Sequence, residues 1–278
     1  MTAGTAPLPV PAAERRTLAA PSSFGSDVAA LTARAIRALL REPESFIPAL
    51  AIPLFFFVVQ IGALGKVAAR AFGIDNYAAF QLPVAVLFAS ANTSGGNALV
   101  LDIDGGYWDK LSLTPVRRSA MVIGTLLGEM FSVICYSLLL TMLGLAMGVR
   151  YVGGELGGIL GLLALTVLFG VGFAAVSVAV ALATGSVRAT QTTFVIFFPL
   201  LFLTPGTLPR SLMQGWFRDA VSVNPITYVL EAGRAFLHET GVAFNAATVS
   251  KGFIAALGFC AFTFSLTALA FRRRARMG

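Results

Sequence analysis

The chain has 278 residues, of which 57% are hydrophobic and only 12% are charged, and its formal net charge is +7. Because a soluble domain has about a quarter charged residues, this composition excludes an ordinary soluble protein and indicates an integral membrane protein. The basic residues cluster at the ends of apolar segments, where they set topology and meet anionic lipid, which argues against nucleic-acid binding.

A tail and an amphipathic helix precede the first long apolar segment. Residues 1–24 contain many alanines and prolines and are predicted to form a disordered cytoplasmic tail, while residues 25–278 are predicted to form one membrane domain. Ser26 can cap a helix whose apolar residues share one face. The opposite face carries three arginines, Arg34, Arg37 and Arg41. This pattern predicts an interfacial helix on the inner membrane surface, either a simple anchor or an element that also contacts a cytoplasmic partner.

Six apolar segments are candidates for membrane-spanning helices, because a helix needs roughly 20 apolar residues to cross the hydrocarbon core. They are residues 46–64, 77–101, 119–147, 156–184, 191–204 and 252–271. The fifth is short before Pro205. An even number of spans places both termini on one side, and most lysines and arginines then fall in the cytoplasm, although Lys66 and Arg70 oppose this bias. The predicted fold is an all-α integral membrane domain with six transmembrane helices and cytoplasmic termini.

Polar residues inside two of these spans are functional candidates, since polar groups in a membrane are costly. Residues 92–97 of the second span are all small or polar, including Asn92 and Asn97. They favour either a substrate path or close interhelical packing with hydrogen bonds. Glu129 is an acid well inside the third span, and it indicates a structural bond to a neighbouring helix or cation and proton handling. Gly124 and Gly128 beside it favour the structural reading.

Residues 105–118 form a long polar segment between spans on the predicted inner side. Asp104 can cap a short helix with an aromatic and aliphatic side, which Thr114-Pro115 would end because proline cannot continue the backbone hydrogen bonds. An ordinary polar loop with Trp108 at the headgroup level is the alternative.

Residues 206–240 are too polar to span again and are predicted to form a partly re-entrant helical hairpin on the outer side. The residues that define it are Pro209, Asn224, Pro225, Tyr228 and Arg234. Arg234 is predicted to pair with Glu231, one helical turn away.

The order of these segments resembles a known family. Residues 106–119 resemble the cytoplasmic coupling region of type-2 ATP-binding-cassette export permeases. Residues 197–209, followed by Asn224-Pro225, Tyr228 and Arg234, look like that family's fifth span, outer hairpin and Asn-Pro…Tyr…Arg signature. The resemblance covers nearly all of residues 25–278. It implies coupling to an ATPase through Gly105, Gly106, Tyr107, Trp108, Asp109, Lys110, Leu111, Thr114 and Pro115.

The resemblance also implies the partners, which are two cytoplasmic ATPase subunits and a second copy of the chain or a paralogous permease. The chain has no P-loop of its own, because Gln60 stands where the first glycine is required and Val67 where a hydroxyl binds Mg²⁺. ATP and Mg²⁺ are therefore expected on the ATPase subunits, with no cofactor or metal in this chain. Cys135 and Cys260 show no zinc or disulfide spacing.

The predicted function is export of a hydrophobic or amphiphilic drug, antibiotic or secondary metabolite, driven by ATP. The candidate substrate path comprises aromatic and amide side chains of the first, second and fifth spans: Phe55, Phe56, Gln60, Gln81, Asn92, Asn97, Phe194, Phe197 and Phe198. The alternatives are an exporter of lipid-linked glycan or envelope lipid, and a proton-coupled secondary transporter that uses Glu129. High alanine, glycine and arginine content suggests a bacterial source and hence the bacterial inner membrane.

Overall fold

The computed structural model describes residues 23–41, 43–92, 95–107, 110 and 116–277, and the predicted tail falls outside them except at its last two residues. The described chain is helical, and its one β-type pairing is the isolated bridge between Tyr151 and Leu237. The helices of the bundle, here called the long helices, are α2 (Pro43–Phe72), α3 (Tyr77–Ala91), α6 (Arg118–Ala146), α7 (Glu155–Thr184), α8 (Val187–Phe202) and α11 (Ala246–Met277). The remaining helical elements are α1 (Phe24–Arg41), α4 (Gly95–Asp104), η2 (Arg210–Leu212), α9 (Gly215–Val223) and α10 (Pro225–Ala235).

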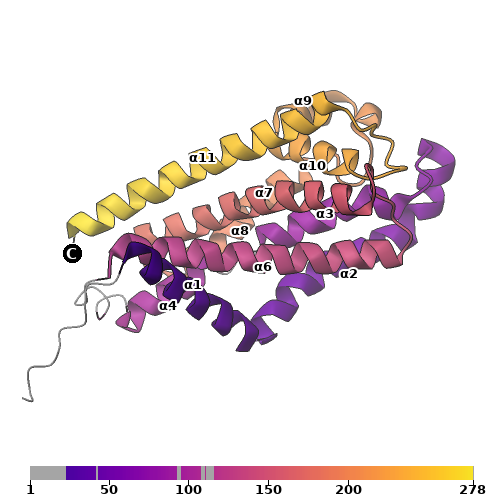
Figure 1. The fold of residues 1–278 in the computed structure, drawn as a ribbon. Helices are drawn as coiled ribbons and strands as arrows, with labels where there is room; N and C mark the ends of the chain where they lie inside the picture. Colours follow the sequence, from indigo (N-terminus) through magenta and orange to yellow (C-terminus); the bar gives the residue numbers. More distant parts are fainter. Residues whose placement is uncertain (1–22, 42, 93–94, 108–109, 111–115, 278) are drawn as a thin grey trace, which may run out of the picture.

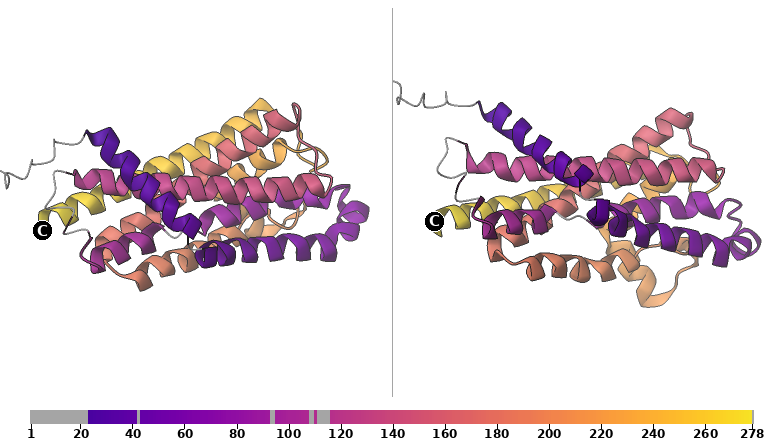
Figure 2. Two further views of the ribbon diagram at one scale, coloured as in Figure 1. Left: turned by 60° about the horizontal axis from the view of Figure 1, so that its bottom comes forward. Right: turned by 90° about the horizontal axis from the view of Figure 1, so that it is seen from below.

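The long helices run side by side in one bundle, and the two ends of the bundle differ (Figure 1). The beginning of α1, the end of α4 and the C-terminus lie at one end, here called the inner end. The short helices α9 and α10 gather at the opposite, outer end. Helix α1 crosses α6 obliquely (Figure 2). Both ends of the described chain therefore lie at the same end of the bundle.

Five helical stretches are long and apolar enough to cross a membrane: Ala49–Phe72, Tyr77–Asp104, Arg118–Ala146, Glu155–Thr184 and Ala246–Arg274. The predicted fifth span corresponds to α8, which has only 16 residues. At about 1.5 Å per residue it is roughly 24 Å long, less than the roughly 30 Å of the hydrocarbon core. Its length therefore does not support six full crossings.

The predicted second span is not one continuous helix. Helix α3 ends at Ala91, where the N–H of Asn92 bonds the carbonyl of Ala89, and α4 begins at Gly95. Asparagine and glycine are poor residues for a helix interior, so this polar stretch ends the helix. Gly96 then lets α4 pack closely on α7, since a Cβ there would lie 2.1 Å from the Ser177 Oγ.

Burial separates central from peripheral helices. Of the most apolar window in each candidate span, 62% is buried in Tyr77–Asp104 but only 11% in Ala49–Phe72 and 22% in Ala246–Arg274. The core therefore lies around α3 and α7. The outer faces of α2 and α11 remain apolar and exposed, and such surfaces require lipid or another protein chain.

Helix α1 packs on α6 through two glycines. A Cβ on Gly124 would lie 2.7 Å from the Leu31 Cβ, and one on Gly128 would lie 2.5 Å from the Ala35 Cβ. The apolar face predicted for this helix therefore contacts protein. The prediction that Ser26 caps this helix is wrong, because α1 begins at Phe24. The N–H of Ser26 instead donates to the Ser23 Oγ at 3.2 Å.

Candidate functional site

At the inner end, Arg34 joins α1 to α4. Its two terminal nitrogens donate to the two carboxylate oxygens of Asp102 at 2.7 and 2.5 Å, and its guanidinium lies 4.1 Å from the centre of the Tyr107 ring. The hydrogen bond to Asp102 raises the pKa of Arg34 above its ordinary value, so the arginine stays charged. We call these three side chains the inner clamp. It connects the predicted interfacial helix to the start of the predicted coupling segment.

The other two arginines of α1 do not share this role. Arg37 donates from Nε to the carbonyl of Ala33 in its own helix at 3.0 Å, and Arg41 is exposed. Sequence periodicity groups the three arginines on one face, whereas contact with a neighbouring helix distinguishes Arg34 from Arg37.

The predicted coupling segment is described only in part. Asp104 is the last residue of α4 rather than the cap of a following helix, and the helix ends as Gly106 turns to φ +67°. Glycine adopts this left-handed conformation at little cost. The N–H of Lys110 then bonds the carbonyl of Gly106 at 3.0 Å, which is one helical turn. Five of the predicted coupling residues lie outside the described residues: Trp108, Asp109, Leu111, Thr114 and Pro115.

In the middle of the bundle, the predicted polar residues Glu129, Asn97 and Asn92 contact neighbouring helices. Glu129 is buried against the first residue of α4, since a Cβ on Gly95 would lie 2.5 Å from the Glu129 Cγ. It also lines a cavity of about 290 Å³ between α1, α4 and α6. Asn97 accepts a hydrogen bond from Thr190 Oγ1 of α8, and Asn92 donates to the carbonyl of Ala49 in α2 at 3.3 Å.

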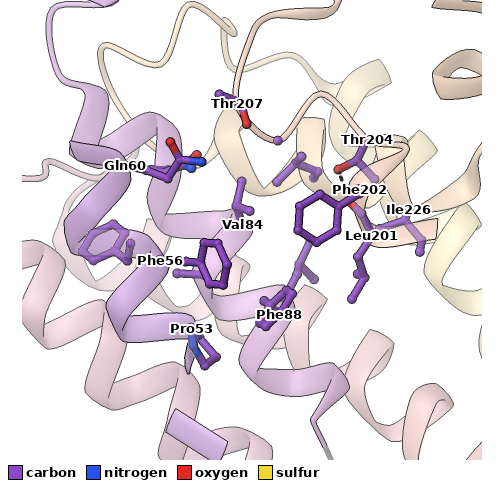
Figure 3. A pocket seen from close by; sticks show the side chains of 16 residues that line it. Pro53, Phe56, Gln60, Val84, Phe88, Leu201, Phe202, Thr204, Thr207 and Ile226 are labelled. Carbon is purple, nitrogen blue, oxygen red and sulfur yellow. Dashed lines mark hydrogen bonds between the residues drawn. The ribbon is translucent and has the colours of Figure 1, made fainter. Parts of the chain in front are cut away.

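At the outer end, helices α2, α3 and α8 surround a pocket of about 90 Å³, here called the outer pocket. Three of the predicted substrate-path residues line it: Phe56, Gln60 and Gln81. Figure 3 shows Phe56 and Gln60 on one side and Phe202 and Thr204 on the other, with Val84 between them, Phe88 below and Thr207 above. Its volume is below the roughly 300–1,000 Å³ of typical small-molecule sites, so in this form it holds only part of a drug-sized compound.

The remaining predicted path residues lie elsewhere. Asn92 and Asn97 do not line the outer pocket, and Phe55 is 64% exposed beside it. Phe198 packs near Phe88, with ring centres 5.9 Å apart. The side chains of Phe194 and Phe197 are outside what the structure describes.

The signature of the outer hairpin holds the end of α8. The Asn224 amide donates to the carbonyls of Leu200 and Leu203 at 2.7 Å each, while its Oδ1 caps α10 by accepting from the N–H of Ile226. The last carbonyls of a helix have no partner within the helix, so this amide satisfies two of them. Pro225 is the first residue of α10, Pro209 precedes η2, and the Tyr228 hydroxyl donates to the Ser222 carbonyl at 2.8 Å.

Arg234 joins the hairpin to α3 and to the roof of the outer pocket. It is 1% exposed, its Nε donates to the Phe80 carbonyl and its Nη2 to the Gly206 carbonyl, both at 3.0 Å. Its guanidinium lies 3.4 Å from the centre of the Phe80 ring. The predicted pair with Glu231 is wrong as an ion pair, because Glu231 pairs instead with Arg210 at 3.8 Å. A carboxylate one turn away is visible in the sequence, but carbonyls from distant segments are not.

Sequence reasoning missed Phe88, Phe202 and Ile226, which also line the outer pocket. Phe88 lies seven residues after Gln81, with Ala85 between them, so all three share one face of α3. That spacing was available in the sequence. Phe202 and Ile226 approach only because the chain turns after α8, and no local pattern indicates this. Among the described residues, no three His, Cys, Asp or Glu side chains gather closely enough to hold a metal ion.

Comparisons with known proteins bear on both ends of the bundle. Residues 26–238 match the sequence model of the ABC-2 type transporter family. The chain is 29% identical over 215 residues to the daunorubicin resistance ABC transporter permease protein DrrB1 of Streptomyces coeruleorubidus, covering 74% of this chain and 73% of that protein. It is 22% identical over 209 residues to the probable doxorubicin resistance ABC transporter permease protein DrrC of Mycobacterium tuberculosis, covering 74% of each. It is 23% identical over 219 residues to the putative transport permease ycf38 of Pyropia yezoensis, covering 76% of this chain and 74% of that protein.

Proposed function

Because the chain belongs to the ABC-2 type transporter family, we propose that it is the permease subunit of an ATP-driven exporter of a hydrophobic or amphiphilic drug-like compound. The permease pairs with a second copy or a paralogue in a bacterial inner membrane, with both termini in the cytoplasm. It has six crossings, of which the one at α8 is shorter than the hydrocarbon core. Two cytoplasmic ATPase subunits bind ATP and Mg²⁺ and supply the driving force.

The observation that carries this proposal is that the residues matched to the family include structural elements at both the inner and the outer end of the bundle. Residues 26–238 include the inner clamp, the predicted coupling segment and nearly all of the outer hairpin. The cargo class is supported by two relatives, whose names give daunorubicin and doxorubicin resistance. The aromatic and amide lining of the outer pocket suits such compounds, which combine rings with hydrogen-bonding groups.

The contacts suggest how movement of an ATPase enters the membrane domain. A push on the segment around Tyr107 and Lys110 acts on α4, because α4 ends only a few residues earlier. The inner clamp then makes α1 follow α4, and Gly124 and Gly128 make α6 follow α1. The Asn97–Thr190 hydrogen bond passes the same displacement to α8, whose last residue lines the outer pocket.

ATP-dependent transport in inside-out membrane vesicles tests the proposal. The permease is co-expressed with a candidate cytoplasmic ATPase, and daunorubicin uptake is measured with ATP and with a non-hydrolysable analogue. We expect the ATPase to co-purify with the permease and uptake to require ATP hydrolysis. Uptake that follows a proton gradient without ATP would overturn the proposal and favour transport through Glu129.

A further inference from the structure

Gln81 presents an unusual polar group to the outer pocket. Its side chain belongs to the fully packed helix α3 and is only 4% exposed. Within the described part of the chain, its Oε1 receives no hydrogen bond. Buried polar atoms nearly always have a partner, so an unpaired acceptor on a side chain that lines a pocket is a candidate to bind a donor from outside the chain.

Three polar groups at the roof of the pocket already have partners. The Thr204 hydroxyl donates to the carbonyl of Leu201 at 2.6 Å, and the Thr207 carbonyl accepts from the Tyr77 hydroxyl at 2.9 Å. The Gly206 carbonyl accepts from Arg234. These groups of the roof therefore have hydrogen-bond partners within the chain, whereas Gln81 Oε1 has none among the described residues.

The backbone beside Gln81 is held in place before any ligand arrives. The residue before it, Phe80, accepts a hydrogen bond from Arg234 at its carbonyl, and the same guanidinium covers its ring. The ring of Phe80 also stacks on Tyr77, with centres 5.6 Å apart. The backbone of Gln81 therefore loses little freedom on binding, which favours selection of a matching donor.

Apart from Gln60 and the roof, the pocket is apolar, and it lies next to exposed apolar surface. Phe56 and Phe88 form an aromatic wall with ring centres 6.0 Å apart, and Phe202 is 53% exposed at the edge. Val59 on α2 is 45% exposed. A ligand that reaches this pocket along α2 and α8 therefore crosses apolar surface before it meets the amide.

We propose that the outer pocket binds the end of an apolar ligand that carries a hydroxyl or N–H donor, and that Gln81 Oε1 accepts this hydrogen bond. The apolar part lies against Phe56 and Phe88 and extends out between α2 and α8. The ligand comes either from the exported compound or from a hydroxyl-bearing membrane lipid. The assignment of the ligand to the exported compound rests on the proposed function, whereas the assignment of the hydrogen bond to Gln81 does not.

A matched pair of probes tests the hydrogen bond. The binding of 1-naphthol and of 1-methoxynaphthalene, which lacks the donor, is measured by equilibrium dialysis with the whole chain in nanodiscs, against empty nanodiscs. We expect 1-naphthol to bind about tenfold or more tightly, because a site built around a hydrogen bond rejects an analogue that lacks it. In Gln81→Met the preference should disappear, while the affinity for 1-methoxynaphthalene stays within about twofold because the side chain keeps its length.

The control is Gln191→Met, which makes the same chemical change on the exposed side of α8, away from the pocket. It should keep the preference for 1-naphthol. Equal binding of the two probes to the wild type, or a preference that survives in Gln81→Met, would overturn the proposal. Thermal unfolding of each variant in the same nanodiscs shows that the variants compared are folded.

Competition separates the two sources of ligand. Displacement of 1-naphthol by diacylglycerol in the nanodisc, in wild type but not in Gln81→Met, supports a membrane lipid. Displacement by daunorubicin with the same dependence on Gln81 supports the exported compound. Failure of ATP-dependent uptake in vesicles would contradict the proposed function but not the ligand site. Equal binding of the two probes would contradict the ligand site but not the proposed function.

Discussion

The two ends of the bundle are held by different kinds of contact. The inner clamp joins two charged side chains at a partly exposed position, where Arg34 is 46% and Asp102 22% exposed at the side chain. The outer hairpin instead uses Arg234 and Asn224, both buried, to bond backbone carbonyls. An exposed ion pair contributes little stability and can re-form in a new geometry, whereas orphaned buried carbonyls are expensive. The difference suits an inner end that moves and an outer end that stays fixed.

The largest loss of stability is expected from Arg234→Met. The substitution removes the Arg234 donors from the carbonyls of Phe80 and Gly206 and the contact with the Phe80 ring. We expect the free energy of unfolding to fall on the order of 3 kcal/mol, seen as a lower Tm of the purified protein. Arg218→Met, on the exposed face of α9, should leave the Tm nearly unchanged. Equal effects of the two variants would contradict the view that the outer end is fixed by buried bonds.

Asn224→Ala should cost about 2 kcal/mol, because it removes a helix cap and two bonds to the end of α8. The roof of the outer pocket should loosen with it, and cysteines placed at Thr204 or Thr207 should react faster with a thiol reagent. Asn245→Ala is the matched control, since Asn245 caps an exposed helix start with a single bond to the N–H of Ala247 at 2.8 Å. A reaction rate unchanged by Asn224→Ala would show that other contacts hold the end of α8.

Gly128→Ala should have a smaller effect, about 1 kcal/mol, because the new Cβ would meet the Ala35 Cβ and push α1 away from α6. Gly258→Ala in α11 meets no atom within 4 Å and should be neutral or stabilising through its helix propensity. Cross-linking between cysteines introduced in α1 and α6 measures the separation. Unchanged cross-linking in Gly128→Ala would mean that the two helices do not depend on this close approach.

The smallest effect on stability, below about 1 kcal/mol, is expected from charge reversal in the inner clamp. Arg34→Asp or Asp102→Arg alone should nevertheless reduce ATP-dependent uptake relative to ATP hydrolysis, because α1 no longer follows α4. The double reversal should restore part of the uptake, while Arg37→Asp should do much less because Arg37 bonds within its own helix. Full uptake in both single variants would refute a coupling role for the clamp.

Long apolar segments were predictable, and interruptions and long-range contacts were not. The segments 119–147 and 156–184 match α6 and α7 to within one residue at each end, because their apolar runs are continuous and flanked by polar residues or glycine. Hydropathy averages over a window, so it joined α3 to α4 across the polar residues after Ala91. Gln60 and Gln81, both predicted for the substrate path, line the same pocket, since both lie among apolar residues of neighbouring spans. The contacts of Arg234 depend on the turn after α8, which no local spacing encodes.

The interruption between α3 and α4 divides the second apolar segment into two helices. Helix α3 is bonded to the hairpin through the Phe80 carbonyl, and helix α4 is bonded to α1 and α8. Under the proposed function, a displacement of α4 is therefore not passed directly to α3. It instead reaches the outer pocket through α8, which covers roughly 18 Å from Thr190 to Phe202 at 1.5 Å per residue. We expect α3 to keep its position during transport, while α8 carries the displacement to the hairpin that holds its end.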